Sequence, residues 1–143
     1  MAYRFLEEIG TADIAFEAMG RDLPELFREA ADATTNVMID NPDAIEPRET
    51  RRIELSNDEV DMLLFDLLQE LIYLKDSERL LLRIKEAHID DKEGRYFLKA
   101  TAEGEPLDAQ RHDQRAGVKA VTLHDFSVER VDGGWKAQVL LDI

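Results

Sequence analysis

The spacing of apolar residues divides this 143-residue chain into two helical stretches and several extended ones. The first helical stretch follows Asp22, which is placed to cap a helix N-terminus, with Pro24 and Glu25 in the first turn. The second follows Ser56 and Glu59, which repeat the capping-box pattern. In both stretches apolar residues recur three and four positions apart, as in a helix with one buried face. These residues are Leu23, Leu26, Phe27, Ala30, Ala31, Val37 and Met38 in the first, and Val60, Leu63, Leu64, Leu67, Leu68, Leu71 and Leu74 in the second.

The remaining regular segments have the alternation or the composition of β-strands. They span residues 3–8, 13–19, 51–55, 80–88, 96–102, 118–131 and 135–142. Asp132-Gly133-Gly134 predicts a hairpin turn between the last two, and residues 40–47, which contain two X-Pro steps, predict a connecting loop. Helices among many short strands indicate an α+β fold. We therefore expect a single domain over residues 1–143, in which two amphipathic helices pack on a largely antiparallel β-sheet.

The chain is strongly acidic, with 18 Lys and Arg against 32 Asp and Glu and a formal net charge of −14 at pH 7. This charge repels nucleic-acid phosphates, so we expect no strong direct nucleic-acid binding. It favours a cation or a basic protein surface as partner. The alternative explanation is that the charge only keeps the protein soluble.

The absence of cysteine excludes disulfides and thiolate metal sites. The chain has neither a secretion signal nor an apolar run of about 18–20 residues, so we expect a cytoplasmic protein without a membrane partner.

Sequence motifs of the common enzyme classes are absent. The chain contains no phosphate-binding glycine loop, no Gly-x-Ser-x-Gly motif and no His-Glu-x-x-His motif. Its three histidines, His88, His112 and His124, are too far apart in sequence to form a ligand set by local spacing. His112 lies in the longest polar segment, residues 103–117, which we expect to be a functional loop, and His124 follows it. A general-base role for either histidine stays open.

The last residues of the chain place anionic groups next to each other. Asp142 is followed by Ile143, whose main-chain carboxylate is the neighbouring anion. If Asp13, at the start of an expected strand, lies beside them, three anionic groups converge. Such a cluster repels itself unless it is protonated or holds a hard cation with oxygen ligands, such as calcium or magnesium. The alternative is an exposed aspartate beside a solvated chain end.

Lys119 is a second candidate, because it interrupts the apolar segment that begins at Val118. A lysine in such a position could neutralise an acidic cluster or contact a phosphate. The alternative is a lysine on the solvent-facing side of a strand.

Short motifs along the chain resemble those of the archease family. Gly10-Thr11-Ala12-Asp13-Ile14 is similar to the family's His-Thr-Ala-Asp motif, with Gly10 in the place of the histidine. The role of that imidazole is therefore absent here, or has passed to His112 or His124. The other matches follow in the family's order over nearly the whole chain. They are Gly20 with Leu26-Phe27, Leu68-Gln69-Glu70-Leu71-Ile72, Gly104-Glu105, Arg111-His112, Val118-Lys119-Ala120-Val121-Thr122-Leu123-His124 and Leu141-Asp142-Ile143.

The resemblance implies a non-catalytic protein cofactor that activates the GTP-dependent RNA ligase of tRNA splicing, by promoting guanylylation and multiple turnover of that ligase. It implies a metal site at Asp13, Asp142 and Ile143, for which calcium is the first expectation and magnesium or manganese are alternatives. Lys119 is a further functional residue by the same resemblance, and His112 and His124 are the other candidates for contact with a cofactor. The alternative functions are a chaperone-like modulator of nucleic-acid-processing proteins and a metal-dependent hydrolase.

Overall fold

The computed structural model describes residues 2–6 and 13–143. The predicted end of the first strand at residues 7–8, and Gly10, Thr11 and Ala12, lie outside the described residues. In the described part the elements follow one another as two strands, a helix, a strand, a helix and four strands, with one 3-10 turn. They are β1 (Ala2–Phe5), β2 (Asp13–Gly20), α1 (Leu23–Met38), η1 (Pro42–Ala44), β3 (Glu49–Asn57), α2 (Val60–Glu78), β4 (Leu80–Lys92), β5 (Arg95–Pro106), β6 (Ala120–Val131) and β7 (Gly134–Asp142).

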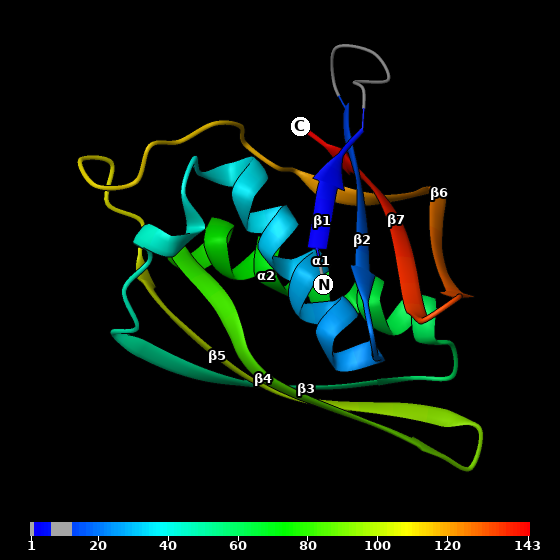
Figure 1. Ribbon diagram of the computed structural model, residues 1–143. Coiled ribbons are helices and arrows are strands. Elements are labelled where there is room, and N and C mark those ends of the chain that lie inside the picture. Colours follow the sequence, from blue (N-terminus) through cyan, green and yellow to red (C-terminus); the bar gives the residue numbers. More distant parts are fainter. Residues whose placement is uncertain (1, 7–12) are drawn as a thin grey trace.

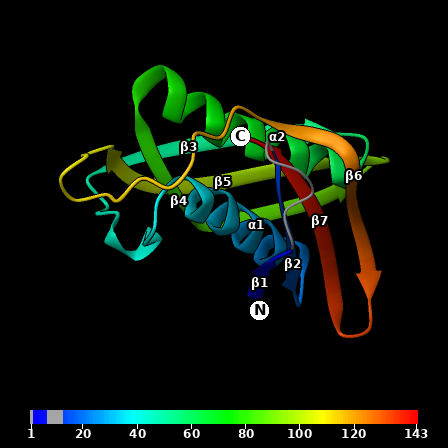
Figure 2. The same ribbon diagram turned by 90° about the horizontal axis from the view of Figure 1, so that it is seen from above.

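The strands form two antiparallel sheets, with the orders β1-β2-β7-β6 and β3-β5-β4. Helix α1 contacts β2 of the first sheet and β4 of the second, and α2 contacts β6 as well as β3 and β4. The two helices therefore lie between the two sheets (Figures 1 and 2). The predicted α+β fold is confirmed, but the single sheet that we expected is replaced by two.

Helix α1 begins and ends where its sequence predicts. The side chain of Asp22 accepts a hydrogen bond of 2.9 Å from the Glu25 backbone N–H, and Pro24 occupies the first turn. Leu26 and Phe27 are fully buried on the face that packs between the sheets. Gly20 permits this packing, because a Cβ atom there would clash with the backbone nitrogen of Leu26.

Helix α2 begins differently from the prediction. Ser56 belongs to β3 and its hydroxyl accepts hydrogen bonds from the Arg95 guanidinium, at 3.1 and 3.2 Å. Glu59 is the N-cap residue and makes no capping bond with its side chain, while the Asn57 side chain accepts a hydrogen bond from the Glu59 backbone N–H. The predicted capping box is wrong because β3 continues to Asn57 to complete its pairing with β5.

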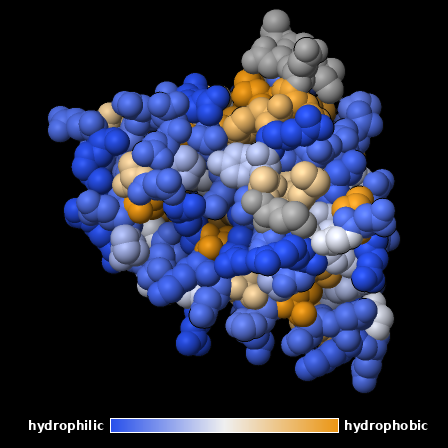
Figure 3. Space-filling view, in the orientation of Figure 1, coloured by the Kyte–Doolittle hydropathy of each residue, from blue (hydrophilic) through white to orange (hydrophobic). Residues whose placement is uncertain are grey.

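The polar segment at residues 103–117 is also divided differently. Strand β5 continues to Pro106, so Gly104 and Glu105 lie in a strand and are buried, and the loop begins at Leu107. Strand β6 begins at Ala120, and its pairing with β7 is interrupted between Thr122 and Ser127. In the part of the chain that the structure describes, no helix is long and apolar enough to cross a membrane. The face drawn in Figure 3 is mostly hydrophilic, with smaller apolar areas between the charged side chains.

Candidate functional site

Asp13 and Asp142 face each other across the pairing of β2 with β7. They are Cα partners at the end of this antiparallel ladder, next to the pair formed by Ile14 and Leu141. Side chains of directly opposed residues lie on one face of a sheet, with Cβ atoms about 4.5–5.5 Å apart. Figure 1 shows the C-terminus beside this end of β2. The fold thus brings together the two aspartates that the sequence analysis singled out.

Ile143 and Lys119 meet the same end of β7. Ile143 is half-buried and packs against the core. The backbone N–H of Lys119 donates a hydrogen bond of 2.8 Å to the Asp142 carbonyl, and Ala120 is the Cα partner of Asp142 on β6. Asp142 therefore lies between β2 and the start of β6. We call Asp13, Asp142 and Ile143 the acidic tip.

The charges of the acidic tip are not neutralised by neighbouring side chains of residues 2–6 and 13–143. Within those ranges the Asp13 and Asp142 carboxylates are in no ion pair and accept no hydrogen bond from another side chain, and both residues are half-buried. Opposed like charges destabilise a pair of strands by a few tenths of a kcal/mol to about 1 kcal/mol. The tip therefore carries an electrostatic repulsion that a cation would remove.

The donor set of the acidic tip is small. Among the described residues, no three His, Cys, Asp or Glu side chains are grouped to hold a metal ion. The tip offers two carboxylate side chains, with a main-chain oxygen of Ile143 as a further donor. Oxygen donors of this kind suit hard cations such as calcium and magnesium, which commonly complete their coordination with water or with a ligand on a partner. The residues present are compatible with a shared site of that type.

A hollow of about 370 Å³ lies beside the acidic tip, between α2 and the residues before β6. Lys119 lines it together with Gln69, Tyr73 and Asp76 of α2. The Gln69 side-chain oxygen accepts a hydrogen bond of 2.9 Å from the Val121 backbone N–H, which fixes the start of β6 on the helix. Sequence analysis named Gln69 only as part of a matching motif and did not name Tyr73, because both lie on a helix whose apolar residues explained its pattern.

His112 lies in a buried cluster of charged side chains. The His112 side chain is fully buried. Its Nε2 lies 3.0 Å from a Glu105 carboxylate oxygen. Its Nδ1 accepts a hydrogen bond of 2.8 Å from the Asp108 backbone N–H. The Nε2–H tautomer satisfies both contacts, with Nε2 as the donor to Glu105. Both ring nitrogens are occupied, so contact with a soluble cofactor would require these hydrogen bonds to break.

Glu105 is the centre of this buried cluster and was not recognised as a partner of His112 from the sequence. Its carboxylate also accepts hydrogen bonds from the Arg111 guanidinium and from the Glu46 backbone N–H, the latter at 2.7 Å. The hydrogen bond from Arg111 is the main reason that the pKa of Glu105 is lowered to about 2, and the donors from Glu46 and His112 contribute to the same shift. We call Glu105 and His112, which are buried, together with the partly exposed Arg111 that donates to Glu105, the buried cluster.

The other two histidines lie on separate elements. His124 is exposed on β6, where its Nε2 is 3.2 Å from a carboxylate oxygen of Asp125, in the interrupted part of the ladder. His88 is on β4 in the second sheet. His112 and His124 thus have different environments, one buried and one in solvent, and the cofactor-binding role of either stays a prediction.

Comparison with known proteins identifies the family. The model of the Archease protein family matches residues 3–143. The chain belongs to the archease family. Its relatives include the archease of Pyrococcus abyssi, which is 39% identical over 134 residues, covering 93% of this chain and 94% of that protein. The archease of Methanosarcina mazei is 37% identical over 142 residues, covering 99% of this chain and 95% of that protein.

Solved structures of archease-like proteins have the same fold. The solution structure of protein 1598 of Methanobacterium thermoautotrophicum superimposes with a TM-score of 0.85, at 38% identity over 99% of both chains. The crystal structure of an archease from Thermotoga maritima, described as a possible chaperone, superimposes with a TM-score of 0.64 over 98% of both chains. At 23% identity, this second likeness shows the fold alone. The resemblance seen in the sequence motifs is confirmed.

Proposed function

We propose that this archease-family chain is a non-catalytic cytoplasmic protein cofactor that activates the GTP-dependent RNA ligase of tRNA splicing, by promoting its guanylylation and multiple turnover. One observation carries the proposal: the cross-strand pair of Asp13 and Asp142, whose carboxylates have no cationic partner among the described residues. Charged groups left unneutralised on a rigid sheet are candidates for contact with a ligand or partner.

The acidic tip is the proposed metal site, with calcium as the first candidate and magnesium or manganese as alternatives. Asp13 and Asp142 would contribute side-chain oxygens and Ile143 a main-chain oxygen. When bound, a divalent cation supplies positive charge that offsets the carboxylates and can be shared with phosphate oxygens of a nucleotide. The two strands hold the carboxylates at a fixed separation, so the protein presents them to the ligase without a change in its own backbone.

Lys119 is proposed to contact the ligase or its nucleotide at the same end of the sheet. Its backbone is held by the carbonyl of Asp142, and its side chain is exposed over the hollow beside α2. A lysine ammonium is a mobile point charge that can pair with a phosphate or with an acidic residue of a partner. The tip would thus present anionic and cationic groups side by side, which suits alignment of charged groups around a nucleotide.

The arrangement of the histidines favours activation of another enzyme over catalysis by this chain. Catalysis by a hydrolase needs a nucleophile or an activated water beside a general base. In the part of the chain that the structure describes, the ring nitrogens of His112 are taken by Glu105 and Asp108, and His124 lies in solvent beside Asp125. Neither imidazole is placed beside the acidic tip by any hydrogen bond or ion pair among these residues.

A chaperone-like role is the second candidate, and exposed apolar side chains favour it. Tyr73 of α2 is 61% exposed and Leu123 of β6 is 62% exposed. Side chains of this kind can contact apolar surfaces of a partner. Suppression of the aggregation of an unrelated protein, retained by an Asp142→Ala variant, would support this role and would separate it from ligase activation.

The test of the proposed function is guanylylation of the ligase with GTP, with and without this protein. Asp13→Ala and Asp142→Ala are expected to abolish the stimulation while leaving the fold intact, since neither side chain supports the core. The matched control is Asp132→Ala, which removes one carboxylate in the hairpin turn at the opposite end of β7. Full stimulation by both tip variants, or equal loss in the control, would show that the tip is not the activating site.

A further inference from the structure

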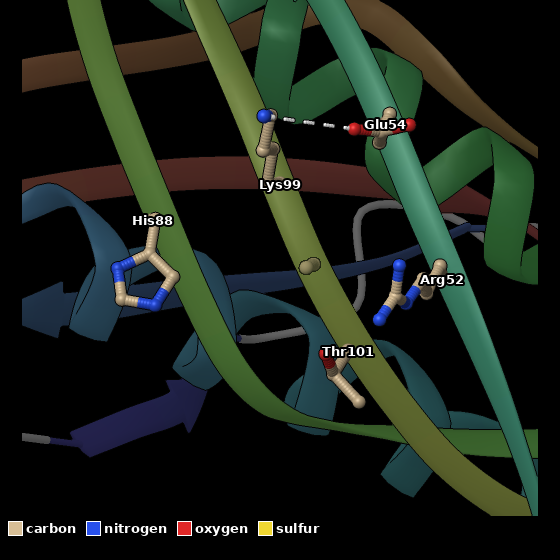
Figure 4. Close-up of a pocket in the computed structure, with 6 residues that line it drawn as sticks. Arg52, Glu54, His88, Lys99 and Thr101 are labelled. Carbon is tan, nitrogen blue, oxygen red and sulfur yellow. Dashed lines mark ion pairs between the residues drawn. The ribbon is translucent and has the colours of Figure 1, made fainter.

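A cationic hollow lies on the outer face of the second sheet, away from the acidic tip. It has a volume of about 210 Å³ and is lined by Arg52 and Glu54 of β3, His88 of β4, and Lys99, Ala100 and Thr101 of the central strand β5. Figure 4 shows Arg52 and His88 on either side of Thr101. A concentration of basic side chains in one hollow is unexpected in a chain with a net charge of −14.

The basic groups of this hollow are weakly neutralised. Within residues 2–6 and 13–143, Arg52 and His88 are in no ion pair, and Lys99 lies 4.0 Å from a Glu54 carboxylate oxygen (Figure 4). Both partners of that pair are largely exposed, and such pairs contribute little. Two other acids stand in register with this face on β4: Glu86, the Cα partner of Thr101, and Asp90, the Cα partner of Phe97. Arg52 thus has free donors for an oxyanion, and a guanidinium is well suited to bind phosphate.

An aromatic side chain continues this cationic hollow along β5. Phe97 is 40% exposed and stands on the same face as Lys99 and Thr101, since alternate residues of a strand share a face. It lines a second hollow of about 190 Å³, which shares Glu54 and Lys99 with the first. Exposed aromatic rings next to basic groups on a sheet surface are the usual means of holding single-stranded nucleic acid, with bases stacked on rings and phosphates on cations.

We propose that the outer face of β3-β5-β4 is a contact site for single-stranded RNA, with a phosphate in the hollow of Arg52, Lys99 and Thr101 and a base stacked on Phe97. The net charge of the chain opposes polyanions, so the contact is weak and limited to a few nucleotides. It agrees with the expectation of no strong direct nucleic-acid binding. This inference goes beyond the proposed function and does not depend on it, because its test contains no ligase.

The experiment is a titration of the ¹⁵N-labelled protein with hexauridylate, followed by backbone amide chemical shifts. The amides of Arg52, Phe97, Lys99 and Thr101 are expected to shift, and the affinity should fall with salt with a log–log slope of about −0.7, for one neutralised phosphate. Phe97→Ala should weaken binding by about 5- to 100-fold, and Phe97→Tyr should retain it, because a tyrosine ring also stacks. The substituted positions, Arg52 and Phe97, are exposed, so the variants are expected to fold.

Matched controls separate RNA binding from general charge effects. Arg52→Ala should reduce the affinity and bring the salt slope closer to zero, by about 0.7 for the lost phosphate. Arg4→Ala, which removes an exposed arginine paired with Glu17 on the other sheet, should leave both unchanged. The proposal is overturned if RNA shifts no amide on this face, if Arg52→Ala binds as tightly as the natural chain, or if hexaglutamate binds the face as tightly as RNA. It is also overturned if the same amide shifts appear when the protein concentration is raised without RNA. That result would indicate that a second copy of the chain binds this face.

Discussion

The acidic tip and the buried cluster both contain carboxylates, but in the described part of the chain the carboxylates have hydrogen-bond donors around them in one region and none from other side chains in the other. In the buried cluster, the 2% exposed side chain of Glu105 receives hydrogen bonds from Arg111, His112 and the Glu46 backbone. In the acidic tip, Asp13 and Asp142 face each other with no cation from the described residues. A carboxylate that is fully hydrogen-bonded inside the protein supports the fold, whereas paired carboxylates without partners are available to something outside the chain.

The buried cluster also has a definite structural task. It anchors the loop that begins at Leu107 to the end of β5, and that loop then runs along the end of α1, where Arg115 and Ala116 donate backbone hydrogen bonds to Met38 and Val37. The loop ends at Lys119, which bonds to Asp142. The two regions are therefore joined by one segment, and variants can separate what each contributes.

The largest expected effect is on stability, from Glu105→Gln. This change removes the negative charge that accepts hydrogen bonds from His112, from the Glu46 backbone N–H and from Arg111. Weakening these hydrogen bonds to a charged group costs about 3 kcal/mol of the free energy of unfolding. The matched control is Glu103→Gln, two residues earlier on β5, whose 3.5 Å ion pair with the exposed Lys85 is only partly buried. Chemical denaturation should show a loss of less than about 1 kcal/mol in the control. Equal losses in the two variants would show that the Glu105 carboxylate supports the fold no more than a carboxylate in a surface ion pair does.

The second effect is stabilisation of the acidic tip by a divalent cation. At a free calcium concentration about 100 times the dissociation constant, the free energy of unfolding should rise by about 2.7 kcal/mol, because the ion binds only the folded chain. Thermal unfolding with and without calcium measures this difference. The rise should be absent in a double variant, Asp13→Asn with Asp142→Asn, and present in Glu105→Gln. Stabilisation of the double variant to the same degree would place the ion elsewhere.

The third effect is a loss of stability at low pH, caused by protonation of Glu105 in the buried cluster. The pKa of Glu105 is lowered from 4.5 to about 2 in the folded protein. The ionised carboxylate therefore contributes fully to the free energy of unfolding above about pH 4.5, and this contribution is lost as the pH falls towards 2. The free energy of unfolding should drop by about 2 kcal/mol between pH 7 and pH 3 through this group alone. Urea denaturation across that range should show a weaker pH dependence in Glu105→Gln than in the natural chain. The same pH dependence of the free energy of unfolding in both chains would show that Glu105 is not its source.

The smallest effect is relief of repulsion in the acidic tip. Without divalent cations, Asp142→Asn should raise the free energy of unfolding by about 0.2–1 kcal/mol, because one of two opposed like charges is removed. Denaturation in the presence of a chelator measures it, with Asp132→Asn as the control. A clear loss of stability in Asp142→Asn would show that its carboxylate supports the fold.

The fold was predictable where the pattern is local. Helix α1 was predicted from the Asp22 cap and the apolar spacing after it, and the start of α2 was misplaced because Ser56 and Glu59 mimic a capping box inside the end of a strand. The division into two sheets was not predictable, since strand pairing joins segments far apart in sequence and periodicity does not name the partner of a strand.

The candidate site was predictable in a different way. Asp13 and Asp142 were singled out by their residue types and the resemblance to archeases, but their opposition depends on the register of β2 and β7, which no local pattern contains. Glu105 and His112 were both visible in matching motifs, and the polar composition around them predicted an exposed loop instead of a buried cluster. Arg52 and Phe97 gave no signal in the sequence, because an alternating strand explains both.

The most direct test of the account is a calorimetric titration of the chain with calcium, magnesium and manganese. Opposed carboxylates on β2 and β7 predict one binding site per chain for at least one of these ions. Binding should be lost in Asp142→Asn and retained in Asp132→Asn. A natural chain that binds none of the three ions, or an Asp142→Asn variant that binds as tightly as the natural chain, would contradict the assignment of the acidic tip as a metal site.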